Sequence, residues 1–221
     1  MDIKQFVWEA VDSNSWLLTE GEHGLLIDAV DSNELFNSIS ELKSLTVILT
    51  HSHFDHIIGL NRIREMKPET TVISTPNCSD NIGNKHRNMS SIADAFIAFY
   101  HNGDKKDYKI SPFACESTTV TFESKYDFCW CKHKVKLDAV HGHSNDGLVA
   151  VIDNKKLFSG DTLLSMPTVT RFPGGDSRKF RLEDVGLLES MSNIEIVYPG
   201  HGNPGKKDDM MRINNIERED N

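Results

Sequence analysis

One short segment, HSHFDH at residues 51–56, constrains the fold and chemistry of this chain more than any other. It places four potential metal ligands within six residues: His51, His53, Asp55 and His56. Residues 46–50, just before it, are apolar and mostly β-branched, which predicts a buried strand. Apolar residues recur at helical spacing over residues 57–66, so a helix is predicted to begin near Asp55 or His56. The ligands are therefore expected on a tight turn held by a strand and a helix, a support that can fix metal geometry.

Three later segments repeat this layout, since in each a predicted strand ends, a glycine follows, and a His or Asp lies beside that glycine. The strands are predicted at residues 135–140, 156–158 and 194–198, and the side chains in question are His143, Asp161 and His201. Glycine lets the backbone turn sharply and approach an ion closely. A catalytic zinc usually takes three protein ligands and a water. Seven ligands therefore suit two ions better than one, with one carboxylate shared.

Composition narrows the classes of function. The chain has 221 residues, 38% hydrophobic and 26% charged, which is typical of a soluble globular protein. Its net charge of -9 argues against broad nucleic-acid binding, because a protein binds phosphate backbones through clustered Lys and Arg. A small anionic substrate stays compatible with that charge, since bound metal ions add positive charge locally.

The sequence predicts a protein that is neither secreted nor inserted in a membrane. No apolar run approaches the roughly 18–20 residues of a membrane span, and residues 1–5 do not begin a signal peptide. We therefore expect a cytoplasmic protein, in which the four cysteines stay reduced. Cys129 and Cys131 form a C-x-C pair, which is interpreted as two residues on one face of a strand rather than as metal ligands.

The whole chain is predicted to form one α/β domain over residues 1–221, with a charged tail or short surface helix at residues 206–221. Further strands are predicted at residues 4–11, 16–19, 24–30, 71–74, 118–122 and 148–152, and further helices at residues 31–42, 89–100 and 180–191. Residues 76–87 are rich in Asn, Ser and Gly and are expected to be irregular.

The four motifs together resemble those of the metallo-β-lactamase superfamily of hydrolases, in order and in spacing. The matching segments are HSHFDH at residues 51–56, GHS at 142–144, FSGD at 158–161 and YPGH at 198–201. The resemblance implies an αββα sandwich, in which two mixed β-sheets carry helices on their outer faces. It also implies two divalent metal ions, with zinc as the default and manganese or iron as alternatives.

The resemblance also implies a role for each ligand. His51, His53 and His143 would hold the first ion, Asp55, His56 and His201 the second, and Asp161 would bridge both together with a water or hydroxide. Asp55 would in addition orient the nucleophile and pass a proton. His141 lies outside this ligand set and is interpreted as a strand-end residue.

Details of the motifs separate this chain from several relatives in the superfamily. True β-lactamases depart at the position of His56 or lack a bridging aspartate like Asp161, and flavin-linked di-iron reductases usually carry Glu where His53 stands. Glyoxalase II adds a carboxyl-terminal helical domain, whereas this chain ends 20 residues after His201. Nucleic-acid-processing members generally add a domain or a basic arm.

We therefore expect a dinuclear hydrolase that cleaves an ester, thioester or lactone-like bond in a small molecule. The alternatives are a phosphodiesterase with the same site, a mononuclear iron oxygenase of the persulfide type, and a metal-binding protein without catalysis. The substrate pocket is expected to be lined by residues 76–130 and by the loop at residues 166–178. In that loop Arg171 is either a substrate-binding residue or a surface ion-pairing residue. The oligomeric state is not predicted.

Overall fold

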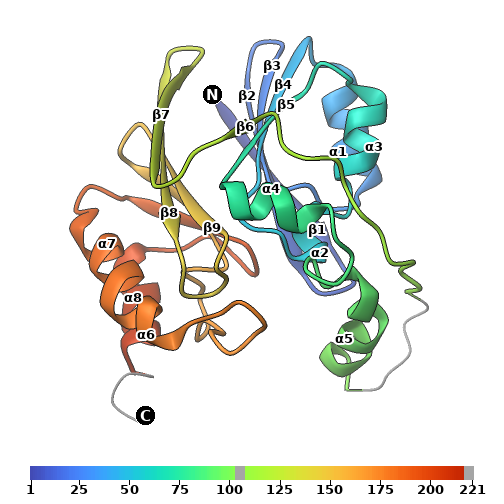
Figure 1. The fold of residues 1–221 in the computed structure, drawn as a ribbon. Coiled ribbons are helices and arrows are strands. Elements are labelled where there is room, and N and C mark those ends of the chain that lie inside the picture. Colours follow the sequence, from blue (N-terminus) through green and yellow to red (C-terminus); the bar gives the residue numbers. More distant parts are fainter. Residues whose placement is uncertain (103–107, 217–221) are drawn as a thin grey trace. The chain divides into compact units, whose positions relative to one another are not determined.

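The protein is described by a computed structural model that covers residues 1–102 and 108–216 (Figure 1). The chain divides into two compact units, Met1–Thr121 and Phe122–Asn221. Each unit contains one mixed β-sheet with helices, and the single domain expected over residues 1–221 stays a prediction. Among the described residues, no helix has the length and apolar character needed to cross a membrane.

The sheet of the first unit has the strand order β1-β2-β3-β4-β5-β6. Its strands are Asp2–Trp8 (β1), Ser13–Glu20 (β2), His23–Ile27 (β3), Ser44–Ile48 (β4), Thr71–Ser74 (β5) and Val120–Thr121 (β6). The first three strands pair antiparallel, and β3 to β6 pair parallel. Parallel strands end at a common edge of a sheet. Asp28 and His51 follow β3 and β4 at that edge.

Helices α1 (Asn33–Ser40) and α3 (Leu60–Met66) belong to this unit and lie side by side in Figure 1. Arg62 of α3 lies over the Phe36 ring of α1, 4.0 Å from its centroid. The helix predicted after the HSHFDH segment is divided into α2 (Phe54–Ile57) and α3. Gly59 lies at the division and donates its N–H to the Ala29 carbonyl at 2.7 Å. A Cβ there would collide with the backbone of Val30, so only glycine permits this approach.

The expectation of an irregular segment at residues 76–87 is wrong for its first half, which forms α4 (Pro76–Ile82). The Thr75 side chain caps this helix by accepting a hydrogen bond from Cys78 N at 3.3 Å, and Pro76 occupies the first turn. Both features favour a helix start and outweigh the Asn- and Ser-rich composition. The helix expected at residues 89–100 begins as the short 3-10 helix η1 (Ser90–Ile92) and continues as α5 (Ala93–Tyr100).

The sheet of the second unit has the order β11-β10-β9-β8-β7. Its strands are Lys125–Trp130 (β7), His133–Val140 (β8), Gly147–Ile152 (β9), Lys156–Gly160 (β10) and Ile196–Pro199 (β11). All neighbours pair antiparallel except β10 and β11, which are parallel. Asp153 and Asn154, between β9 and β10, both have positive φ, a conformation for which Asn and Asp are suited.

The helices of the second unit are α6 (Ser177–Lys179), the π-helix η2 (Phe180–Asp184), α7 (Val185–Ser190) and α8 (Lys207–Ile216). All except α6 contribute to a buried apolar core shared with the sheet. The core includes Val149 and Leu157 of the sheet, Phe180 and Leu188 of the helices before β11, and Met210 of α8. The tail expected at residues 206–221 is therefore a helix through residue 216, and residues 217–221 lie outside the described part.

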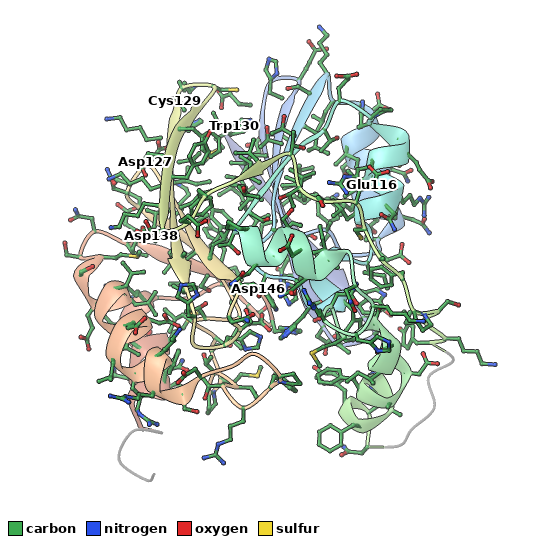
Figure 2. All side chains as sticks on the ribbon, viewed as in Figure 1. Glu116, Asp127, Cys129, Trp130, Asp138 and Asp146 are labelled. Carbon is green, nitrogen blue, oxygen red and sulfur yellow. The ribbon has the colours of Figure 1, made fainter. Side chains whose placement is uncertain are left out.

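Most of strand β7 was not predicted, since only the interpretation of the C-x-C pair placed residues of this region in a strand. Its residues alternate between exposed and more buried, as Asp127, Cys129 and Trp130 illustrate in Figure 2. An edge strand with charged residues on one face resembles a loop in sequence. The interpretation of the C-x-C pair is also only half right, because Cys129 lies in β7 but Cys131 lies in the following turn, with φ of 50°.

Candidate metal centre

The first unit brings four predicted ligands together on the turn after β4. His51, His53, Asp55 and His56 are all buried. The His51 ring lies 4.5 Å from the His53 ring and 4.3 Å from the His56 ring, measured between centroids. His56 Nε2 lies 3.4 Å from Asp55 Oδ2. A strand and the short helix α2 therefore hold three imidazoles and one carboxylate in a compact cluster, as the sequence predicts.

A buried carboxylate, Asp28, supports this turn, although sequence reasoning did not select it. Asp28 follows β3 with a positive φ of 60° and is 1% exposed. Its two oxygens accept hydrogen bonds from Thr50 N at 2.7 Å, from Thr50 Oγ1 at 2.7 Å and from His56 Nδ1 at 2.9 Å. Burial raises the pKa of Asp28, while the charge and hydrogen bond of His56 and the two bonds from Thr50 oppose that rise.

These bonds determine which nitrogen carries the proton in two of the histidines. His56 donates from Nδ1 to Asp28, so its lone pair is on Nε2. The Thr50 hydroxyl uses its single proton toward Asp28, so it accepts from His51 Nδ1, 3.0 Å away. His51 therefore also carries its lone pair on Nε2. Histidines that bind metals are commonly oriented by this kind of bond from the other ring nitrogen.

The second unit contains a second cluster, formed by His143, Asp161 and His201. Asp161 Oδ2 lies 3.6 Å from His143 Nε2 and 3.4 Å from His201 Nε2. The three residues follow β8, β10 and β11, and Gly200 N donates to the Gly160 carbonyl at 2.8 Å, which ties two of these turns together. His143 Nδ1 donates to the Val169 carbonyl at 2.7 Å, so its lone pair is also on Nε2.

The distances within each cluster suit metal ligands. The three Nε2–carboxylate distances, 3.4 to 3.6 Å, exceed the usual range of about 2.7–3.2 Å for a hydrogen bond. Two atoms that each lie about 2.1 Å from one zinc at tetrahedral angles are about 3.4 Å apart. Imidazole and carboxylate donors also admit manganese and iron. The residues present therefore fit divalent metal ions, and the assignment of each ligand to a particular ion stays a prediction.

The remaining predicted residue, Arg171, is exposed in the irregular segment between β10 and α6. Its neighbour Phe172 packs edge-to-face against the His143 ring, with 6.0 Å between ring centroids. Asp176, in the same segment, caps α6 by accepting from Arg178 N and Lys179 N. The segment after β10 therefore contacts His143 of the second cluster, and its part in a substrate pocket stays a prediction.

Comparisons with known proteins agree with this description. Residues 8–80 match the family model described as the Metallo-beta-lactamase superfamily. A search of curated proteins finds no significant match to this sequence.

Several solved structures are similar to this chain in fold. BLEG-1 B3 metallo-beta-lactamase has a TM-score of 0.77 and 19% identity, over 97% of this chain and 99% of that chain. ETHE1 from Myxococcus xanthus has a TM-score of 0.70 and 20% identity, over 97% and 83% of the two chains. TTHA1623, solved in a di-iron-bound form, has a TM-score of 0.70 and 21% identity, over 96% and 99%. At these identities the similarity concerns the fold.

Proposed function

We propose that this chain is a dinuclear metal-dependent hydrolase, because residues 8–80 match the Metallo-beta-lactamase superfamily model and the chain has the fold that its motifs imply. Its substrate would be a small molecule with an ester, thioester or lactone-like bond. The observation that carries the proposal is the pair of His and Asp clusters, in which histidines hold their protons on Nδ1 and present Nε2 beside a carboxylate.

The proposed ligands are those implied by the family resemblance. His51, His53 and His143 would bind one ion, Asp55, His56 and His201 the other, and Asp161 both. TTHA1623, similar in fold, was solved in a di-iron-bound form, which supports two ions rather than one. When bound, two divalent ions would lower the pKa of a water toward about 7 and stabilise the negative charge that develops on the substrate.

The chain's own residues would prepare the site for this chemistry. Asp28 and Thr50 keep His51 and His56 in the tautomer that presents Nε2. The Asp55 carboxylate lies on the same turn and is proposed to orient the attacking water and accept its proton. Ser13 Oγ donates to the Asp55 carbonyl at 3.2 Å, so β2 helps to fix this residue.

The proposal is tested with metal-loaded protein and a panel of generic substrates: a thioester, a lactone, a phosphodiester and a β-lactam. We expect hydrolysis of the thioester or the lactone, loss of that activity with a chelator, and recovery with zinc or manganese. Preferred hydrolysis of the phosphodiester would favour the phosphodiesterase alternative. Full metal binding with no hydrolysis of any probe, or activity that needs one iron and oxygen, would contradict the proposal.

We further propose that the protein acts on a freely diffusing small molecule in the cytoplasm, without nucleic acid or membrane as partner. The net charge of -9 supports this view because a nucleic-acid site needs clustered positive charge. Fractionation of cells that express the tagged protein tests the location, and an electrophoretic mobility assay at low salt tests nucleic-acid binding.

A further inference from the structure

A second buried carboxylate, Asp184, lies behind the turn that carries His143. Asp184 is 2% exposed and ends η2, a π-helix between α6 and α7. Short π-helical segments are rare in proteins and frequently occur at functional sites. Burial raises the pKa of Asp184, and hydrogen bonds from two backbone N–H groups oppose the rise.

Both oxygens of Asp184 bind the turn directly. Oδ1 accepts from His141 N at 3.1 Å, and Oδ2 accepts from Gly142 N at 2.7 Å. These two amides immediately precede His143. The carboxylate can come this close only because residue 142 is glycine. A Cβ at Gly142 would lie 2.5 Å from Asp184 Oδ2 and 2.6 Å from the Phe180 Cα.

Other contacts fix the same turn from the same helical segment. Asp176 N donates to the Gly142 carbonyl at 2.8 Å. The turn is thus held at its two amides by Asp184 and at one carbonyl by the residue that caps α6. The His143 ring is held separately, through its bond from Nδ1 to the Val169 carbonyl. The backbone and the ring of His143 are therefore oriented by independent groups.

Burying a carboxylate costs free energy, and the hydrogen bonds that Asp184 accepts from two backbone amides offset that cost. The two oxygens satisfy two consecutive amides beside a predicted metal ligand. Groups that support metal ligands from behind commonly alter metal affinity by 10–100-fold when they are changed.

We propose that Asp184 is a positioning residue for His143: its carboxylate binds the amides of His141 and Gly142 and so fixes the place from which the His143 imidazole reaches a metal ion. The inference rests on the proposed function, because it takes His143 as a ligand. It also gives His141 a role, through its backbone N–H, in place of the strand-end interpretation made from sequence.

Asp184→Asn tests the proposal, because it keeps the size of the side chain but replaces one accepting oxygen with an NH2 group. Asp153→Asn is the matched control. Asp153 is also an aspartate of the second unit, and it accepts hydrogen bonds from His133 Nδ1 at 2.6 Å and Lys134 N at 3.1 Å. Zinc affinity is measured by competition with a chromophoric chelator, and the visible spectrum is recorded with cobalt in place of zinc.

We expect Asp184→Asn to bind at least one zinc about 10–100-fold more weakly than wild type and to change the cobalt spectrum. Asp153→Asn should match wild type in zinc affinity within about twofold and should leave the cobalt spectrum unchanged. Equal zinc affinity in wild type and Asp184→Asn would overturn the inference, and so would an equal loss of affinity in both variants.

Two further outcomes keep the test decisive. If Asp184→Asn does not fold, the smaller Asp184→Ser replaces it, and failure of both variants to fold would show a purely structural role and overturn the inference. If wild type binds zinc but hydrolyses no probe, the proposed function fails while the affinity comparison still decides the role of Asp184.

Discussion

Asp28 and His56 are joined by a hydrogen bond of 2.9 Å between a carboxylate oxygen and Nδ1, across 28 positions of the sequence. The same carboxylate receives the Thr50 hydroxyl, which in turn accepts from His51. One buried aspartate therefore orients His56 directly and His51 through one intervening side chain. The loop after β3 and the ligand turn after β4 are linked by these bonds.

The first prediction concerns this aspartate. In Asp28→Asn, the new Asn also tolerates the positive φ at position 28. Its NH2 group, however, is a hydrogen-bond donor and would face a group that now donates to Asp28. We expect zinc affinity to fall about 10–100-fold and stability to fall by about 1–3 kcal/mol. Zinc competition and thermal unfolding of the metal-free protein measure the two effects. Asp31→Asn, at an exposed position nearby, is the control and should change neither. Unaltered zinc affinity in Asp28→Asn would remove Asp28 from the site.

Asp28 is a residue of the site that the sequence alone does not identify. The ligands could be predicted because His and Asp follow apolar strands at recognisable spacing, whereas the two mixed sheets were implied by the family resemblance. Asp28 is a single acidic residue after an apolar strand, and no spacing links it to His56. Its importance comes from the parallel pairing of β3 with β4, which is a tertiary property.

The second unit also has structural features that the sequence pattern does not predict. The helix expected at residues 180–191 is present only as a π-helical turn followed by α7. Periodicity of apolar residues does not distinguish these forms. The role inferred for Asp184 depends on that turn and on a glycine with no room for a Cβ, which can be seen only in three dimensions.

The second prediction concerns metal stoichiometry. Seven His and Asp side chains in two clusters are more than one ion normally takes from a protein. Protein purified with zinc in the buffer should hold close to two ions per chain, measured by elemental analysis against amino-acid analysis. A reproducible value near one ion per chain with full activity would contradict the dinuclear site.

The third prediction concerns Asp161, which lies between two imidazoles of its cluster. Asp161→Ala should lose at least one zinc and most hydrolytic activity, because the proposed shared ligand is removed. Asp176→Ala is the comparison. It removes the side-chain cap of α6 and should lower stability slightly, with metal content unchanged. The same metal content in Asp161→Ala as in wild type would show that Asp161 is not the bridge.

The fourth prediction concerns pH. Burial raises the pKa of Asp153, but the hydrogen bonds from His133 and Lys134 outweigh it, so this pKa lies below its ordinary value. The carboxylate thus stabilises the fold above the ordinary Asp pKa of about 4 and loses that effect as pH falls through the folded-state pKa.

Asp153→Asn should therefore lower the melting temperature of the metal-free protein near pH 6. The effect expected for a partly exposed pair is ~0.5 kcal/mol, or about 1–2 °C for a chain of this size. The difference should shrink as pH is lowered from 5 toward 3. An equal difference at pH 6 and pH 3 would mean that charge on Asp153 is not the cause.

The last prediction concerns Arg171. It is exposed in the segment after β10, and its neighbour Phe172 packs against the His143 ring, which brings this part of the segment next to the second cluster. A guanidinium there can offer paired donors to a carboxylate or phosphate of the substrate. If Arg171 binds substrate without taking part in the chemistry, Arg171→Ala should raise KM about tenfold, equivalent to ~1.4 kcal/mol, with kcat and metal content unchanged.

Arg178→Ala, which removes another exposed arginine in α6, directly after this segment, is the control and should leave KM unchanged. Charge recognition also requires that the Arg171→Ala effect be smaller for an uncharged analogue than for an anionic substrate of the same size. Steady-state kinetics on such a pair of substrates separates this role from general damage to the segment, which would raise both KM values alike. An unaltered KM for every anionic substrate that is hydrolysed would leave Arg171 as a surface residue.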